Sequence, residues 1–247
     1  MSALILGPHL YAACVVMVVM AAAVYGLSRL GPVWTVPVAT ARAAGQLAAV
    51  SATLASAMAR LWTSILVLVV MIGVATVTAV RRAQVSHGAA WLTAPIVTGL
   101  TVSLSPLLLS RVVPLTGVAL IPIVGIVLGG TMTSSAVAAR LTLNMLVVRC
   151  GEVEAALSLG FRPRDARMEI IRHTGAEALV PNLDQARTAG LVVLPGAFVG
   201  VLLSTGSAAQ ACVAQILVIV ALLLSQSCAV ALTCELVARS RITRDGV

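Results

Sequence analysis

The segment "AQACVAQILVIVALLLSQSCAVALTCELVA", residues 209–238, decides the fold class of this chain. Its only charged residue is Glu235, near the end of the segment. A helix of about twenty apolar residues is long enough to cross the roughly 30 Å hydrocarbon core of a bilayer. The segment therefore predicts a membrane-spanning helix, and comparable apolar runs recur along the chain.

The composition agrees with this prediction. Of the 247 residues, 60% are hydrophobic and 10% are charged, and the mean hydropathy is +1.08. A soluble domain carries about 25% charged residues. Membrane β-barrels would require strands of about ten alternating residues, and the sequence does not have this pattern. We therefore expect an all-α integral membrane protein, with residues 1–247 forming a single transmembrane domain.

The apolar runs and the residues that interrupt them predict about seven transmembrane helices, at residues 3–28, 37–59, 61–80, 90–110, 114–139, 187–205 and 209–238. The first run has no basic segment before it, so we expect a retained helix and not a cleaved signal peptide. The second run is the least apolar. It is rich in small residues, which favour close helix packing in lipid.

The distribution of arginine predicts the orientation, because arginine supplies all sixteen positive charges of the chain. One set of alternate connections holds Arg29, Arg81, Arg82, the six arginines from Arg140 to Arg172, and Arg239, Arg241 and Arg244. The opposite set holds only Arg60 and Arg111. Cytoplasmic loops carry an excess of positive charge, so the first set is expected inside. The N-terminus is then outside and the C-terminus is cytoplasmic.

The largest predicted cytoplasmic feature is the segment of residues 140–186. From Arg140 to Arg187 the chain carries seven arginines and six acidic residues, whereas Glu152 is its first acidic residue of any kind. A segment of this length is too short for a catalytic domain. We therefore interpret it as a docking surface.

Within this segment, "EAALSLG" at Glu154–Gly160 predicts a short helix that a partner can approach closely. Its docking face would combine small, apolar and charged side chains, namely Ala155, Ala156, Val153, Leu157 and Glu154. Gly160 can adopt the left-handed conformation that ends a helix. Pro163 suits the first turn of a second helix, with Asp165 near its positive end. A solvated amphipathic connector is an alternative interpretation of the same spacing.

The spacing Glu-Ala-Ala, three residues and Gly resembles the cytoplasmic signature of ABC transporter permeases. Further features resemble the FetB-type ABC transporter permease family, which includes bacterial iron-export permeases and is related to plant aluminium-tolerance half-transporters. The resemblance runs from about Arg42 to the tail. It rests on Arg42 with Gln46, "IPIVGIVLGGTM" (residues 121–132), "EAALSLG", "LVP" (179–181), "GLVVLPGAFVG" (190–200) and Gln215.

The chain departs from the family pattern at several positions. The family usually has two asparagines flanking a methionine, and here Gly130 and Thr133 stand around Met132. A glutamine is common where this chain has Val201, and only Ile170 matches the end of the wider ABC signature. These losses of polar groups leave the identity of the substrate undecided. They do not change the expected architecture.

The resemblance implies a permease subunit of an ATP-driven transporter in the bacterial inner (plasma) membrane, exporting a metal such as iron. A Walker A motif needs a lysine, and this chain has none, so we expect no enzyme activity here and ATP with Mg²⁺ in a partner ATPase. The expected assembly is a homodimer in the lipid bilayer with two ATPase subunits. The residues expected to dock the ATPase are Glu152, Val153, Glu154, Ala155, Ala156, Leu157, Gly160 and Arg162.

Other readings of the function stay open at this point. The chain could be an ABC permease for another solute, such as a nucleotide sugar, to which plant relatives have been linked. It could also be a partner-free secondary transporter or channel, which would need coupling charges near the middle of the membrane. A structural membrane subunit is a further alternative.

Candidate residues for the translocation path are Arg42, Gln46, Met132, Thr133, Pro195, Gly196, Gly200 and Gln215. An arginine inside a membrane is costly and therefore a functional candidate, although Arg42 could equally extend to the cytoplasmic interface. Pro195 is expected to lie inside the helix 187–205 and to kink it. Gly196 and Gly200 form a GxxxG face, which favours helix packing.

The remaining polar residues indicate no further chemistry. We expect Glu235 to form a structural ion pair with the tail arginines. His9, His87 and His173 are scattered, so the sequence predicts no metal site, and no nucleophile is accompanied by a base for a catalytic site. Aromatic residues are only 3% of the chain and the arginines flank apolar runs, which argues against nucleic-acid binding. The five cysteines form no CxxC pair and are interpreted as small hydrophobic residues.

Overall fold

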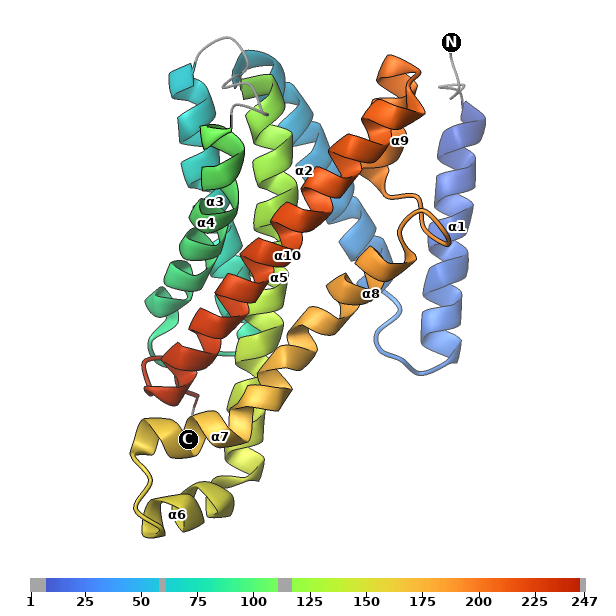
Figure 1. The fold of residues 1–247 in the computed structure, drawn as a ribbon. Coiled ribbons are helices and arrows are strands. Elements are labelled where there is room, and N and C mark those ends of the chain that lie inside the picture. Colours follow the sequence, from blue (N-terminus) through green and yellow to red (C-terminus); the bar gives the residue numbers. More distant parts are fainter. Residues whose placement is uncertain (1–7, 58–60, 111–116, 245–247) are drawn as a thin grey trace. The chain divides into compact units, whose positions relative to one another are not determined.

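The computed structural model describes residues 8–57, 61–110 and 117–244, and within these ranges the regular structure is helical (Figure 1). The chain forms two compact units, residues 1–59 and 60–247, and each is described by itself. The expectation of a single permease domain stays a prediction. The all-α architecture is confirmed.

The first unit is a helical hairpin of α1 (Pro8–Leu27) and α2 (Thr35–Ala57). Arg29 begins the turn with a positive φ of 51°. A Cβ atom at Gly31 would lie 2.9 Å from the ring of Tyr25, so a side chain larger than hydrogen would push the turn away from α1. The hairpin therefore depends on glycine at this close approach.

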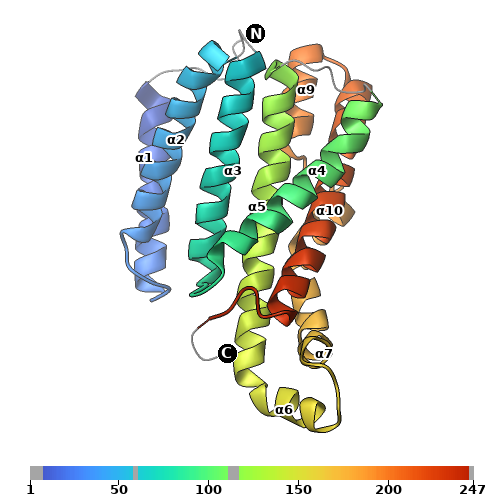
Figure 2. The ribbon, with the colours of Figure 1, turned by 90° about the vertical axis from the view of Figure 1, so that its left-hand side faces the viewer.

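The second unit is built from four long helices and several short ones. The long helices are α3 (Leu61–Ala83), α4 (Thr93–Leu109, after the 3₁₀ turn Ala89–Leu92), α5 (Gly117–Val148) and α10 (Ala208–Ala238). The helix α5 packs against α3 and α10, and α4 packs against α5 and α10 (Figures 1 and 2). The short helices α6 to α9 connect α5 to α10.

Two clusters of buried apolar side chains hold this unit together. The first joins α5, α7, α10 and the tail through Leu143, Ile171, Val237 and Ile242, which are all at most 1% exposed. The second joins α3, α4 and α5 and is centred on Ile96 and Val127.

Small residues bring α4, α5 and α10 close together between the clusters. A Cβ atom at Gly99 of α4 would lie 2.5 Å from the carbonyl oxygen of Ser225 in α10. The hydroxyl groups of Thr131 and Ser225 are 2.5 Å apart and hydrogen-bond between α5 and α10. Close backbone approach and interhelical hydrogen bonds are the means by which helices associate in lipid.

The expected helix 187–205 is wrong as a continuous element. The helix α8 (Val180–Thr188) ends before a turn in which Gly190 has a φ of +85° and the carbonyl of Thr188 accepts hydrogen bonds from Leu191, Val192 and Val193. The helix α9 begins only at Gly196 and ends at Thr205. Pro195 is its N-cap, where the missing N–H costs nothing, so it does not kink a helix interior.

The helix α5 is longer than expected. Its end is predicted at residue 139, but the sequence has no glycine or proline from there to Val148. The helix continues through Arg140 to Val148, so the first part of the segment 140–186, which is predicted to be a cytoplasmic docking surface, belongs to a long helix. The other helices agree with the prediction to within a few residues. The expected starts at residues 3 and 114 lie outside the described residues.

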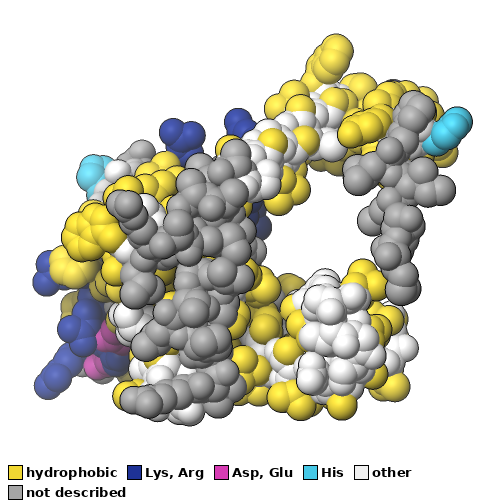
Figure 3. All heavy atoms as spheres, turned by 90° about the horizontal axis from the view of Figure 1, so that it is seen from above, with side chains coloured by type: hydrophobic (Ala, Val, Ile, Leu, Met, Phe, Trp, Pro, Cys, Tyr) yellow, Lys and Arg dark blue, Asp and Glu magenta, His cyan; other side chains and the backbone are white. Residues whose placement is uncertain are grey.

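By length and apolarity, five helices among the described residues could cross a membrane: α1, α3, α4 with its preceding 3₁₀ turn, α5 and α10. The helix α9 is apolar but has only ten residues. On the face drawn in Figure 3, hydrophobic side chains are exposed among backbone and other side chains, and many large apolar residues of the chain are exposed. Outward apolar side chains on long apolar helices are expected where lipid is the solvent. The number of spans and the orientation of the termini stay predictions.

Candidate functional site

The "EAALSLG" motif forms the second half of a short helix, α6 (Cys150–Ser158), as the sequence predicted. Its end is a Schellman motif: the N–H of Phe161 donates to the carbonyl of Ala156, and the N–H of Gly160 donates to that of Leu157. Gly160 has a φ of +87°, which favours glycine. The predicted role of Gly160 in ending this helix is confirmed.

Some side chains of α6 pack against the rest of the chain, and others are exposed to solvent. Val153 is half-buried and packs against the first core cluster. Glu154, Ala155 and Leu157 are exposed, with Leu157 at 39%. Val153 therefore attaches α6 to the rest of the second unit. A partner could reach fewer residues of α6 than the sequence predicts for docking.

The helix α7 (Pro163–Ala176) follows α6 after a short turn and fixes it to the long helices. Pro163 occupies the first turn and Asp165 lies near the positive end, both as predicted. One face of α7 is buried, through Ala166, Ile171, Thr174 and Gly175. A Cβ atom at Gly175 would run into Cys234 of α10, so these two helices approach through a glycine.

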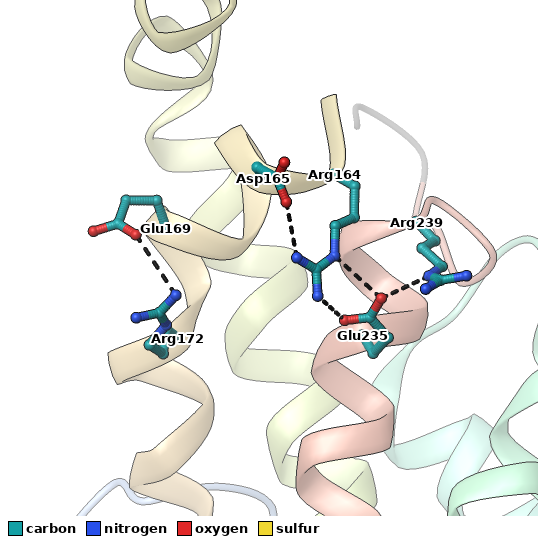
Figure 4. A network of polar contacts seen from close by, with 6 residues as sticks. All are labelled: Arg164, Asp165, Glu169, Arg172, Glu235 and Arg239. Carbon is teal, nitrogen blue, oxygen red and sulfur yellow. Dashed lines mark hydrogen bonds and ion pairs between the residues drawn. The ribbon is translucent and has the colours of Figure 1, made fainter. Parts of the chain in front are cut away.

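An ion-pair network ties the start of α7 to the end of α10 (Figure 4). The guanidinium of Arg164 donates to both carboxylate oxygens of Glu235, over 3.1 Å and 2.5 Å, and to Asp165 over 2.8 Å. Arg239 donates to Glu235 over 2.6 Å. The hydrogen bonds to Glu235 and Asp165 raise the pKa of Arg164 above its usual value. A paired contact of one guanidinium with both carboxylate oxygens fixes the relative orientation of the two side chains and also strengthens their attraction.

The expected pairing of Glu235 with a tail arginine is confirmed by its bond to Arg239. The sequence does not predict the second partner, Arg164, which lies 71 residues away from Glu235 along the chain. The only signal available was an arginine in the first turn of a predicted helix, and that signal does not name a partner.

The tail continues this attachment beyond α10. Arg167 of α7 hydrogen-bonds to Ser240, and the N–H of Thr243 donates to the carbonyl of His87 in the connection between α3 and α4. Arg241 lies over the ring of Trp91, 5.3 Å from its centroid. The α3–α4 connection, α7 and the tail therefore lie at one end of the second unit (Figure 2).

The candidate residues of the translocation path belong to different elements of the two units, and their shared role stays a prediction. Arg42 and Gln46 are exposed on α2 in the first unit. In the second unit, Met132 packs against the second core cluster. Thr133 donates its hydroxyl proton to the carbonyl of Gly129 and lines a basic pocket with arginines of α3 and α5.

Pro195 and Gln215 do lie together. They line a cavity of about 480 Å³ between the α8–α9 connection and α10, with Ala186, Gly190, Phe198 and Ile219 also in its wall. Gln215 is 8% exposed, and its side-chain oxygen accepts a hydrogen bond from the N–H of Phe198 over 3.1 Å. The amide therefore satisfies a donor at the start of α9 and places one polar group in a mainly apolar wall.

Metal-ligating side chains do not gather in the described part of the chain: no three His, Cys, Asp or Glu residues lie close enough there to hold an ion. His173 and His87 lie on different elements, in α7 and in the α3–α4 connection. The described residues therefore suggest no metal site beyond what the sequence indicates.

Long apolar helices, outward apolar side chains and a short helical module at the arginine-rich end define the class: an all-α, multi-pass membrane protein. A family model described as "Uncharacterised protein family (UPF0014)" matches residues 9–242. The chain belongs to this family.

Curated relatives of this chain come from plants and bacteria. Over 149 residues it is 36% identical to "UPF0014 membrane protein STAR2" of Oryza sativa subsp. japonica, covering 60% of this chain and 52% of the relative. Over 155 residues it is 34% identical to "Protein ALUMINUM SENSITIVE 3" of Arabidopsis thaliana, covering 62% and 57%. Over 144 residues it is 30% identical to "Probable iron export permease protein FetB" of Escherichia coli, covering 58% and 56%.

The matched part of the chain thus spans just over half the length of these relatives. The resemblance to the FetB-type family is confirmed. No solved structure gives a significant match.

Proposed function

We propose that this chain is the membrane-spanning permease subunit of an ABC transporter whose ATP is hydrolysed by a separate subunit. The observation that carries this proposal is the helix α6. It lies outside the long apolar helices, presents Glu154 and Leu157 to solvent, and is joined through α7 to α10. A short exposed helix with a rigid connection to membrane helices is suited to transmit a conformational change of a partner subunit to those helices.

Movement of α6 would reach the membrane helices through α7. The ion pairs of Arg164 with Glu235 and the close contact of Gly175 with Cys234 resist sliding of α7 against α10. The helix α10 also carries Gln215, which lines the 480 Å³ cavity beside Pro195. A displacement at α6 is therefore expected to change the shape of that cavity.

The orientation follows from charge. The arginine-rich ends of α3, α6, α7 and the tail belong to one end of the second unit, and the positive-inside rule assigns such an end to the cytoplasm. We propose a homodimer with two ATPase subunits, which bind the ATP and Mg²⁺. No described atom lies within 4 Å of a Cβ atom built at Gly196 or Gly200, so this face is open to a second copy.

For the cargo we propose export of a metal such as iron, because a bacterial relative is named a probable iron export permease. The substrate is tested in the reconstituted complex by ATPase stimulation with Fe²⁺ and with nucleotide sugars. Stimulation by Fe²⁺ supports the metal assignment. A flat response to Fe²⁺ with a response to a nucleotide sugar would replace it.

The docking proposal is tested by co-purification with the ATPase and by ATPase activity in proteoliposomes. Glu154→Arg combined with Gly160→Leu is expected to abolish association. Glu177→Arg, which makes the same charge change at an exposed position of the connection between α7 and α8, is the matched control and is expected to associate normally. Association of the Glu154→Arg/Gly160→Leu protein at the unmodified level would refute docking through α6.

A further inference from the structure

A pocket lined by three exposed arginines lies between α3 and α5. Its volume is about 300 Å³, and its lining residues are Arg81, Arg82, Gln84, Thr133, Ala136, Val137 and Arg140. Arg81 and Arg82 belong to the last turn of α3, which ends beside the middle of α5 (Figure 2). Arg140 lies two turns beyond Thr133 on α5, so the guanidinium groups come from two helices.

The arginines of this pocket differ from the ion-paired arginines of α6 to α8 and the tail, although Arg162 also has no ion pair among the described residues. Arg149, Arg164, Arg172, Arg187 and Arg239 each have a carboxylate partner within 4 Å. Within the described part of the chain, Arg81, Arg82 and Arg140 have neither an ion pair nor a hydrogen bond with another side chain, and no acidic residue lines the pocket. Three like charges facing one cavity repel one another unless an anion lies between them.

The shape of the pocket selects the kind of anion. Guanidinium groups bind phosphate oxygens through paired hydrogen bonds, so three of them around one cavity suit a phosphate group. The amide of Gln84 can add a donor at the rim. Ala136 and Val137 give the inner wall an apolar surface, which suits the part of a ligand that follows the phosphate. Basic pockets between membrane helices bind anionic headgroups in this way.

We propose that the pocket of Arg81, Arg82 and Arg140 binds the phosphate group of an anionic ligand at the cytoplasmic boundary of the membrane. The phosphate has two possible sources, the headgroup of a lipid and a soluble phosphate compound. The site is separate from α6 and from the cavity at Gln215, so it does not depend on the proposed coupling to an ATPase.

The test measures thermal unfolding of the purified protein with three additions: phosphatidylglycerol, phosphatidylcholine and inorganic phosphate. Stabilisation by phosphatidylglycerol alone identifies a lipid headgroup. Stabilisation by inorganic phosphate identifies a soluble source. Arg140→Gln and the double change Arg81→Gln/Arg82→Gln are expected to weaken the apparent affinity about tenfold or more, because each removes charge-assisted hydrogen bonds.

Two controls separate a built pocket from general attraction to a positive surface. Arg172→Gln, on α7, removes the same charge outside the pocket and is expected to keep the wild-type affinity. Arg140→Lys keeps the charge without the forked donors and is expected to fall between wild type and Arg140→Gln. No response to either anionic addition, or an equal loss in Arg172→Gln and Arg140→Gln, would overturn the proposal.

Discussion

Gly175 of α7 lies against Cys234 of α10 without room for a side chain, so its replacement by alanine has a cost that can be estimated. The added methyl group would run into Cys234 Sγ and lie 3.4 Å from Thr142 Cγ2. Overpacking of a buried contact costs about 1–3 kcal/mol. Alanine in a helix interior is favoured over glycine by roughly 0.5–1 kcal/mol. The two effects together predict that Gly175→Ala destabilises the protein by about 1 kcal/mol, within a range of roughly 0–2.5 kcal/mol.

Removing the obstacle is expected to change the sign of this effect. In a Cys234→Ala background the methyl group has room, so only the helix preference remains and Gly175→Ala becomes neutral or slightly stabilising. Thermal unfolding of the four proteins in lipid nanodiscs gives the interaction energy, expected to equal the overpacking cost of about 1–3 kcal/mol. Gly129→Ala is the matched control, because no described atom lies within 4 Å of a Cβ atom built there. If Gly175→Ala lowers the free energy of unfolding equally in both backgrounds, the contact with Cys234 is not the cause of the loss, and the overpacking explanation is refuted.

Three further substitutions test the attachment of the arginine-rich end. Arg164→Glu should lower the melting temperature, and adding Glu235→Arg should recover part of the loss, whereas an unrecovered loss would contradict the ion pair. Gly160→Ala should cost about 1 kcal/mol in thermal unfolding, and Gly160→Asn should cost less, because asparagine tolerates a positive φ better. Arg241→Gln should cost about 0.5–1 kcal/mol, and this cost should vanish in a Trp91→Leu background.

The features that the sequence predicts correctly depend on local chemistry. Apolar runs of sufficient length identify the long helices, because each helix satisfies its own backbone groups in lipid. The end of α6 is also local: Gly160 supplies the left-handed residue and Pro163 begins the next helix. Both elements of the docking segment could therefore be placed from the sequence.

The failed helix at 187–205 shows the limit of hydropathy. Leu191 to Leu194 are apolar, but an apolar stretch does not distinguish helix from turn. Gly190 with its positive φ and Pro195 as N-cap interrupt the segment and leave a short α9. Both residues are visible in the sequence, and together they are a stronger signal for a break than hydropathy is for a continuous helix.

The tertiary partners could not be predicted, since they depend on how the helices pack. The sequence places Glu235 near Arg239, one helical turn away, but only the packing of α7 on α10 brings Arg164 to the same carboxylate. In the same way, the convergence of Arg81 with Arg140 depends on the register between α3 and α5. A single sequence contains no information on that register that can be read directly.

The central claim, that α6 is the surface on which an ATPase subunit docks, is tested most directly by site-specific photocrosslinking. A photoreactive residue at position 157, on the exposed side of α6, is expected to crosslink to the co-expressed ATPase subunit. The same residue at position 203, exposed on α9, serves as the control and is expected to give no such product. A crosslink to the ATPase from position 203 but not from position 157 would contradict the account.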